Sequence, residues 1–370
     1  EPSRTNVAEQ SEYQSSSIYT NASVSISDNV AISPEGLSNA AKIILDSGTN
    51  TSNGGHSDAF SSTAGTNYTI SVFAKAGEMR YFTFTYGSSS ATGGHFDLQE
   101  GTLLGTITNA QYSNESASIE DYGNGWYRLI VSLTDSSTNT GRRLSMKPSP
   151  SASVPSNNNY SSTGDGTSGA YIYGFQTEVA ASYATSYIPT YGSSQTRAQE
   201  VCGDAGDASI FNDSEGVLFV EFSALSDTRD NEFRFLISNG TNSERIQIGL
   251  QTSDNLYANS IVGNVTQATI SDSLPNPSSN HKIAFKYKTN DFALYVDGVK
   301  VGTDISGTTP TGLNKFYFYR VPANNNYVEG NVKQTIYFPT ALTDSECVEL
   351  TINGLKEELI AAYKTRVTTL

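Results

Sequence analysis

Residue sets that could do chemistry are few in this sequence of 370 residues. A retaining glycosidase needs two carboxylates about 5 Å apart, which alternate positions of one strand supply in a Glu-x-Asp-x-Glu pattern. That pattern is absent, and the nearest acidic group, Glu115 with Glu120 and Asp121, straddles a predicted turn at the wrong spacing. A Gly-x-Ser-x-Gly elbow before a helix, which would indicate a serine hydrolase, is absent as well. These residues do not predict an enzyme.

Metal-binding and redox-active residues are equally scarce. His56, His95 and His281 fall on separate predicted turns and strand starts without ligand spacing, so a histidine-based zinc site is not expected. Cys202 and Cys347 are too few for a disulfide scaffold or a cysteine-based metal site. A bridge between them is conceivable if the two ends of the second half pair as strands. Two reduced, partly buried thiols are the favoured interpretation.

Acidic residues near the middle of the chain leave calcium as the remaining metal to consider. Asp204, Asp207 and Asp213 lie close together in a stretch that also contains glycine. Calcium loops place their oxygen ligands at fixed positions along the chain. The spacing of these three aspartates matches no such loop. No cofactor is therefore expected, and calcium stays an alternative.

Aromatic, amide and guanidinium side chains on loops are the groups that could bind a sugar. Sugar recognition uses aromatic faces against the C–H side of a pyranose, with amide and hydroxyl groups around them. Candidates sit where loops interrupt predicted strands: Tyr257, Tyr319, Arg320 and Tyr327 in the second half, and Tyr86, Tyr112 and Tyr160 in the first. For each tyrosine, a side chain that packs between strands is the competing interpretation.

Composition limits the classes of partner. Asp and Glu total 37 against 22 Lys and Arg, which gives a net charge of −15. Such a chain repels nucleic-acid phosphates and an anionic membrane surface. No apolar run approaches the ~20 residues of a spanning helix, so neither nucleic-acid binding nor membrane insertion is expected. The charge also favours a glycan partner that is neutral, weakly anionic or bridged by a cation.

The elements that must position these side chains are predicted to be strands. Short β-rich runs separated by Gly, Asn, Ser and Asp are typical of an all-β protein. Residues 68–77 alternate polar and apolar positions, which is the pattern of a half-buried strand. Asp297 and Gly298 lie between two such runs and predict a hairpin turn, because both tolerate positive φ. Trp126 follows a turn and starts a strand, so we expect it to anchor a core.

Helical signals are confined to the end of the chain. Thr343 and Glu346 resemble a capping box that starts a short helix. Residues 355–366 form the longest helical pattern, with Leu355, Leu359 and Tyr363 on one face.

Length and a shift in composition around 198–214 predict two domains. The expected segments are an N-terminal arm or linker at 1–17, a first β domain at 18–198, a boundary at 199–213, a second β domain at 214–352 and a C-terminal helical segment at 353–370.

Five segments of the first half carry a family resemblance. They are Arg4-Thr-Asn, residues 68–77, Gly123-Asn-Gly-Trp-Tyr-Arg128, Tyr173-Gly-Phe-Gln-Thr-Glu178, and residues 183–190 with Thr196-Arg-Ala198. In this order they resemble the jelly-roll, carbohydrate-binding-like domain of tailed-phage tail fibre and minor tail proteins, over about residues 4–198. The segments 281–288, 291–298 and 341–344 resemble the concanavalin A-like, laminin-G-like lectin domain that often follows it.

This resemblance implies two β-sandwiches in a non-catalytic phage tail component that recognises host-surface or extracellular glycans. It further implies location in a virion tail or outside the cell, contacts with other tail proteins, and a homotrimer.

Three alternatives remain open from the sequence. The domains could be accessory carbohydrate-binding modules of a secreted bacterial adhesin or a polysaccharide-degrading enzyme, or a structural spacer in a fibre. The third is a polysaccharide lyase or glycosidase on the concanavalin-like sandwich. Alginate-lyase-like sandwiches carry Arg-x-Glu-Leu-Arg, Gln-Ile-His and Tyr-Phe-Lys-Ala-Gly strands. Here Phe73-Ala-Lys-Ala-Gly77 resembles the last but lies in the first domain, and Gln247-Ile-Gly249 lacks the histidine.

Overall fold

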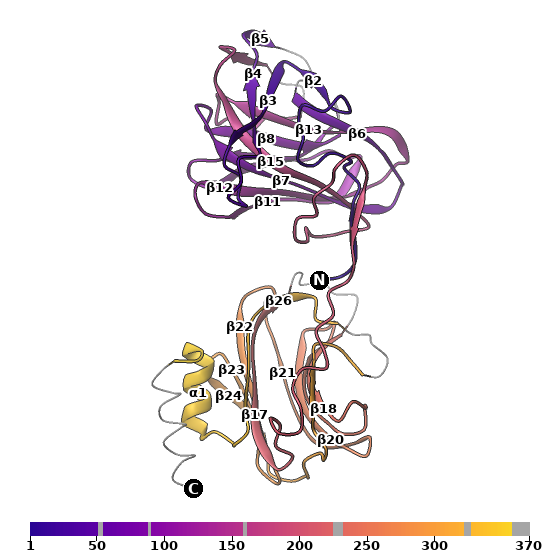
Figure 1. The fold of residues 1–370 in the computed structure, drawn as a ribbon, viewed down its shortest axis with the longest axis vertical. Coiled ribbons are helices and arrows are strands. Elements are labelled where there is room, and N and C mark those ends of the chain that lie inside the picture. The colour runs from indigo at the N-terminus through magenta and orange to yellow at the C-terminus, as the bar shows by residue number, and fades with distance from the viewer. Residues whose placement is uncertain (51–54, 88–89, 158–160, 225–231, 322–326, 357–370) are drawn as a thin grey trace. The chain divides into compact units, whose positions relative to one another are not determined.

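The computed structural model describes residues 1–50, 55–87, 90–157, 161–224, 232–321 and 327–356 (Figure 1). The chain divides into two compact units. The first unit is Ser3–Ala198, and the second is Gln199–Leu370 together with Glu1–Pro2. The described residues form antiparallel strands and one helix, which confirms the all-β prediction of sandwich domains with a short C-terminal helix.

The first unit packs two large sheets face to face. One runs in the order β11 (Tyr112–Asp121), β12 (Trp126–Asp135), β7 (Thr66–Ala76), β15 (Gly169–Val179), β1 (Arg4–Asn6) and β16 (Gln195–Arg197), with β4 (Ala40–Leu45) on β15 and β3 (Val24–Ala31) on β4. The other runs β10 (Thr102–Ile107), β9 (Thr92–Asp97), β8 (Tyr81–Tyr86), β13 (Asn139–Ser149), β6 (Gly55–Ser62) and β2 (Thr20–Ala22). A small ribbon pairs β5 (Gly48–Asn50) with β14 (Ser162–Gly164).

Alternating side chains fill the core between these two sheets. Ile70 and Val72 of β7 and Phe82 and Phe84 of β8 are fully buried in it. Trp126 lies on the other face of its sheet, 2% exposed, in a smaller apolar cluster. Its indole Nε1 donates a hydrogen bond to the Ile32 carbonyl at 3.1 Å, so the prediction that Trp126 anchors a core is confirmed.

The first residues of the chain differ from the arm expected at 1–17. Arg4–Asn6 pairs with β16 and, through Asn6 opposite Glu178, with β15. The Asn6 amide is fully buried and donates to the carbonyls of Phe175 and Ile188. These bonds pair polar groups that would otherwise be buried without a partner. They hold Arg4–Asn6 in the first sheet as a strand.

The second unit is also a two-layer sandwich. One sheet runs β24 (Val299–Asp304), β23 (Phe292–Val296), β22 (His281–Lys288), β17 (Glu215–Ala224) and β26 (Gly330–Phe338). The other runs β21 (Val265–Ser273), β20 (Asn255–Val262), β19 (Arg245–Leu250), β18 (Phe233–Ser238) and β25 (Lys315–Tyr317). The core between them contains Phe222, Ile248, Phe285 and Leu294.

The predicted turn and helix start of this unit are confirmed. Asp297 and Gly298 connect β23 to β24 with φ values of 47° and 86°. Helix α1 (Asp344–Asn353) begins with the Thr343–Glu346 capping box. The longer helical pattern predicted at 355–366 falls almost entirely on residues outside the described part of the chain.

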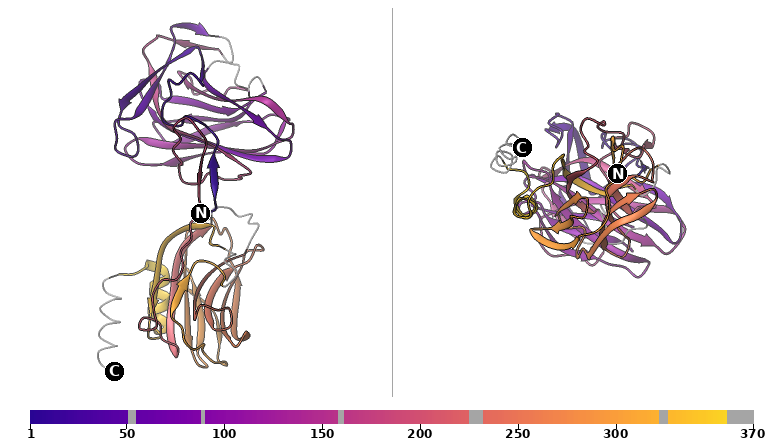
Figure 2. Two further views of the ribbon diagram at one scale, coloured as in Figure 1. Left: turned by 45° about the vertical axis from the view of Figure 1, so that its right-hand side comes forward. Right: turned by 90° about the horizontal axis from the view of Figure 1, so that it is seen from below.

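Helix α1 covers the outer face of the β22–β24 sheet. Its Cys347 and Leu350 side chains are fully buried against Phe219, Ala284 and Tyr295. The turned view in Figure 2 also places α1 on the outside of this sheet.

Both cysteines are free, with Cys202 exposed and Cys347 buried, in agreement with the favoured reduced state. Within the described residues, no helix is long and apolar enough to cross a membrane.

Candidate functional site

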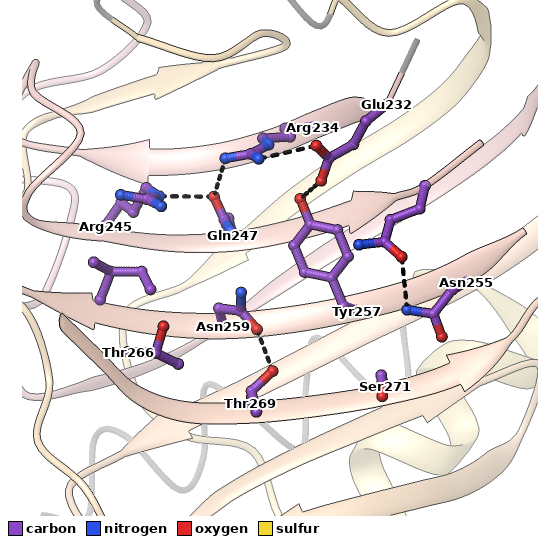
Figure 3. A pocket seen from close by; sticks show the side chains of 12 residues that line it. Glu232, Arg234, Arg245, Gln247, Asn255, Tyr257, Asn259, Thr266, Thr269 and Ser271 are labelled. Carbon is purple, nitrogen blue, oxygen red and sulfur yellow. Dashed lines mark hydrogen bonds and ion pairs between the residues drawn. The ribbon is translucent and has the colours of Figure 1, made fainter. Parts of the chain in front are cut away.

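A groove of about 380 Å³ lies on the outer face of the sheet opposite α1 (Figure 3). Strand alternation explains its chemistry. On β19, Ile246 and Ile248 point into the core, while Arg245 and Gln247 point outward. The described lining comes from four strands and the residues beside them: Glu232, Arg234, Arg245, Gln247, Gln251, Asn255, Tyr257, Asn259, Ile261, Thr266, Thr269 and Ser271.

Gln247 organises one end of the groove. Its side chain is 2% exposed, and its Oε1 accepts a hydrogen bond from Arg245 Nε at 2.8 Å and one from Arg234 Nη1 at 3.4 Å. One amide oxygen therefore orients two guanidinium groups from neighbouring strands. Arg234 also donates through Nη2 to Glu232 Oε2 at 3.0 Å, which fixes the guanidinium from a second side (Figure 3).

Tyr257 forms the middle of the groove floor. Its hydroxyl donates to Glu232 Oε1, and its ring lies 6.0 Å from the Arg234 guanidinium carbon. Gly249 is paired with Tyr257 across β19 and β20, and a Cβ at Gly249 would overlap the ring. The glycine therefore leaves the space that lets the tyrosine lie flat across its own sheet. Burial, reinforced by the Glu232 carboxylate, raises the pKa of Tyr257, so its phenol stays protonated.

Amides and hydroxyls make up the more open side. Asn259 is paired with Thr269 across β20 and β21, and Thr269 Oγ1 donates to Asn259 Oδ1 at 2.6 Å. Asn255 Nδ2 donates to Gln251 Oε1 at 3.2 Å. The side chains of Asn255 and Asn259 are half-buried and Thr269 is exposed, so each keeps hydrogen-bonding capacity for a ligand.

The predicted glycan-binding residues of the second half lie in two places. Tyr257 lines the groove, but its side chain is 6% exposed. Tyr319 is 5% exposed and packs between Tyr317 and Tyr327, with ring centroids 5.3 Å apart in both pairs. Tyr327 is half-buried in that aromatic cluster, and Arg320 is half-buried close enough to Arg245 to affect its pKa.

The candidates of the first half are core or lie outside the described residues. Tyr86 is fully buried and donates to Asp135 at 2.8 Å. Tyr112 is 6% exposed and packs edge-on against Tyr86. Both are structural tyrosines, as the competing interpretation held. Tyr160 falls outside the described residues.

Sequence reasoning missed Arg234, Arg245, Gln247 and Asn259. The signal was period-two polarity on strands: Arg245-x-Gln247 on β19, Asn255-x-Tyr257-x-Asn259 on β20 and Thr269-x-Ser271 on β21. Each run alone predicts only a solvated strand face. These polar runs line one groove only because the register of β19 and β20 places Gln247 opposite Asn259.

Each of the three aspartates considered for calcium accepts hydrogen bonds from different donors. Asp204 accepts hydrogen bonds from Lys315 and Tyr317. Asp213 accepts from the backbone of Gly312 and Leu313, and Asp207 accepts from Ser209 within its own turn. Among the described residues, no three His, Cys, Asp or Glu side chains gather in a metal-binding group.

The first unit has a groove of its own, of about 440 Å³, beside β8 and β14. Its charged residues are already paired within the protein. Arg80 holds Asp97 at 2.6 Å, and Asp165 accepts three hydrogen bonds from Thr167 and Ser168. This groove therefore offers a ligand fewer open charges than the groove of the second unit.

Comparison with solved structures gives low-identity matches. CBM40 of the Ruminococcus gnavus IT-sialidase is 12% identical, with 41% of this chain and 97% of that chain covered and a TM-score of 0.33. A SAP-like pentraxin from Limulus polyphemus is 12% identical, with 40% and 74% covered and a TM-score of 0.32. Sheep galectin-11 is 7% identical, with 38% and 99% covered and a TM-score of 0.27.

Comparison with curated proteins gives no match. Residues 220–347 match the family model of the concanavalin A-like lectin/glucanases superfamily. This range runs from β17 to α1 and contains both sheets that form the sandwich and its groove. The second unit is therefore a concanavalin A-like domain.

Proposed function

We propose that the second unit binds glycans in the groove on the outer face of the β18–β21 sheet, and that the chain acts as a non-catalytic recognition component. The observation that carries this proposal is the lining of the groove. Amide, hydroxyl and guanidinium groups from four paired strands converge on it. Because strands hold side chains more rigidly than loops, little order has to be gained when a polyhydroxylated ligand binds.

The groove supports binding better than glycoside hydrolysis. Glycosidases of both stereochemical classes use a pair of carboxylates. Among the described lining residues, Glu232 is the one carboxylate, and it already accepts hydrogen bonds from Arg234 and Tyr257. Tyr257 is also a poor general base for a lyase, since burial raises its pKa and keeps the phenol protonated.

A glycan array probed with the 370-residue chain tests the proposal. The paired substitution Asn259→Ala with Thr269→Ala should lower the signal of any bound glycan by roughly 10- to 100-fold, because it removes two to three ligand hydrogen bonds of about 1 kcal/mol each from the open side of the groove. Asn331→Ala on β26, an exposed asparagine of the opposite sheet, is the matched control and should bind as the wild type does.

Two results would contradict the proposal. Absence of binding across the array and to candidate host cells would remove glycan recognition. Release of reducing ends or unsaturated products from algal or bacterial polysaccharides would instead favour the enzyme alternative.

The setting we propose for this recognition is a phage tail. It rests on the resemblance of residues 4–198 and of the second half to tail fibre and minor tail proteins. In that setting the chain is carried on the virion, forms a homotrimer and contacts other tail proteins and the host surface. Mass spectrometry of purified virions and the solution mass of the chain test this. A monomer found only in the secreted fraction would favour the adhesin or accessory-module alternative.

A further inference from the structure

Positive charge is concentrated at one end of the groove, although the chain is acidic overall. Arg234 and Arg245 line this end, and Arg320 lies close enough to Arg245 to affect its ionisation. Glu232 pairs with Arg234 alone among these guanidinium groups. In the described part of the groove, the arginines therefore outnumber the carboxylates.

These arginines have hydrogen-bond donors left over. Arg245 is 8% exposed, and its Nε is used by Gln247. Its Nη1 is buried and has no hydrogen-bond partner among the described residues, and the same holds for Nε of Arg234 and Nε of Arg320. A buried donor without an acceptor costs free energy, and the cost is larger for a charged group. A ligand acceptor at this end would recover it.

The ionisation of Arg245 agrees with an incomplete counter-charge. Burial, followed by repulsion from Arg234 and Arg320, outweighs the attraction of Glu232 and lowers the pKa of Arg245 to about 10. The guanidinium is still charged at neutral pH, so the protein holds a desolvated cation that an anionic ligand group would stabilise.

We propose that the groove takes an acidic sugar residue, with its carboxylate against Arg245 and Arg234. This rests on the proposed glycan-binding function and names the class of sugar. A guanidinium presents parallel N–H donors in a plane that matches the two oxygens of a carboxylate. Gln247 orients both guanidinium groups before the ligand arrives.

The rest of the groove explains why one acidic sugar, rather than a dense polyanion, fits best. Beyond the arginines and Glu232, which is already paired with Arg234, the described lining is uncharged and includes Asn255, Asn259, Thr269 and Ser271. The net charge of −15 repels a long polyanion, whereas a single carboxylate feels mainly its neighbours within a Debye length of about 8–10 Å. The net charge favoured a neutral or weakly anionic glycan. The arrangement of the arginines favours, among these, a glycan with one carboxylate in direct contact with them.

Ligand pairs that differ only in charge test the inference on the wild-type chain. The probes are lactose capped with N-acetylneuraminic acid and the monosaccharide galacturonic acid, each compared with its methyl ester by calorimetry at low and at physiological salt. We expect at least one acidic form to bind at least tenfold more tightly than its ester, and this preference to shrink as salt is raised. Sulfated lactose is included, and an equal preference for it would overturn the choice of a carboxylate.

Variants locate the carboxylate contact. Arg245→Gln and, independently, Arg234→Gln should each reduce binding of the acidic form by roughly 10- to 100-fold and reduce binding of the ester by a smaller factor. Arg143→Gln, an exposed arginine of the first unit, removes the same charge elsewhere and should have no effect. Circular dichroism and melting temperature establish that each variant is folded.

The outcomes separate this inference from the proposed function. Equal binding of acid and ester that still depends on Asn259 and Thr269 would overturn the acidic-sugar inference and leave glycan recognition standing. An acidic preference that survives both arginine variants would overturn the assignment of the contact. Absence of binding to every glycan tested would remove both proposals.

Discussion

Gly249 is the position at which a single added methyl group should reorganise the groove. It lies opposite Tyr257, and its Cβ in a Gly249→Ala variant would fall 2.7 Å from Tyr257 Cε1. Tyr257 is 6% exposed, so the ring cannot shift slightly within its present site. We expect the ring to move off the surface of β19 and the Tyr257 hydroxyl to lose its hydrogen bond to Glu232.

The cost follows from what the ring gives up. A hydrogen bond to a charged group contributes about 1.5–3 kcal/mol. Alanine in place of glycine within a strand regains about 0.5–1 kcal/mol of conformational entropy. The variant should therefore lower the free energy of unfolding of the second unit by about 1–2 kcal/mol.

The assay can follow each unit separately. Trp126, the single tryptophan of the chain, is buried in the first unit, so its fluorescence reports that unit and should be unchanged. Hydrogen exchange at the amides of β19 and β20 reports the second unit and should become faster. Gly141→Ala is the matched control, because a Cβ at Gly141 has no neighbour closer than 3.9 Å.

A double-mutant cycle can refute the reasoning. If the ring is the obstacle, Gly249→Ala should cost nothing in a Tyr257→Ala background, where the space above the glycine is empty. An equal cost in both backgrounds would mean that the tyrosine does not lie over Gly249.

Three further outcomes are expected. Thr343→Ala removes the cap that accepts from the Glu346 amide and should destabilise the second unit by about 1 kcal/mol in chemical denaturation, whereas Thr343→Ser should not. Burial lowers the pKa of His56 from 6.5 to about 3, so the unfolded chain binds the proton more readily. The stability of the first unit should then fall as the pH is lowered from about 6.5 towards 3, and a flat profile of tryptophan-monitored unfolding would contradict this. Asp135→Asn breaks a buried ion pair with Arg142 at 2.7 Å and should cost about 3–5 kcal/mol in the same assay, while a loss below about 1 kcal/mol would show that the pair is not essential.

Local signals made much of the fold predictable. The turn at Asp297 and Gly298 and the cap at Thr343 depend on backbone preferences of a few adjacent residues, and both are present. The strand at Arg4–Asn6 was not predictable in this way. Its partners lie near Glu178 and Arg197, so its hydrogen bonds depend on chain closure over the whole first unit.

The candidate site was predictable only in part. Tyr257 could be identified because an aromatic residue near a loop is visible in the sequence. The convergence of Arg234 and Arg245 on Gln247 is visible only once β18 and β19 are in register. Tyr319 shows the reverse case. The sequence suggested an aromatic side chain available to a ligand, whereas the segment at Gly203 packs directly against the Tyr319 ring and buries it.

The cover that α1 places over the β22–β24 sheet has a consequence for attachment strength. A sandwich has two outer faces, and in the second unit the helix occupies one of them with Cys347 and Leu350. The other outer face carries the groove, so under the proposed glycan recognition the second unit of one chain would engage a surface at a single point. Firm adhesion would come from multivalency: chains joined in one particle raise the effective concentration of every further groove once the first is engaged, and avidity can exceed single-site affinity by about 10²–10⁴.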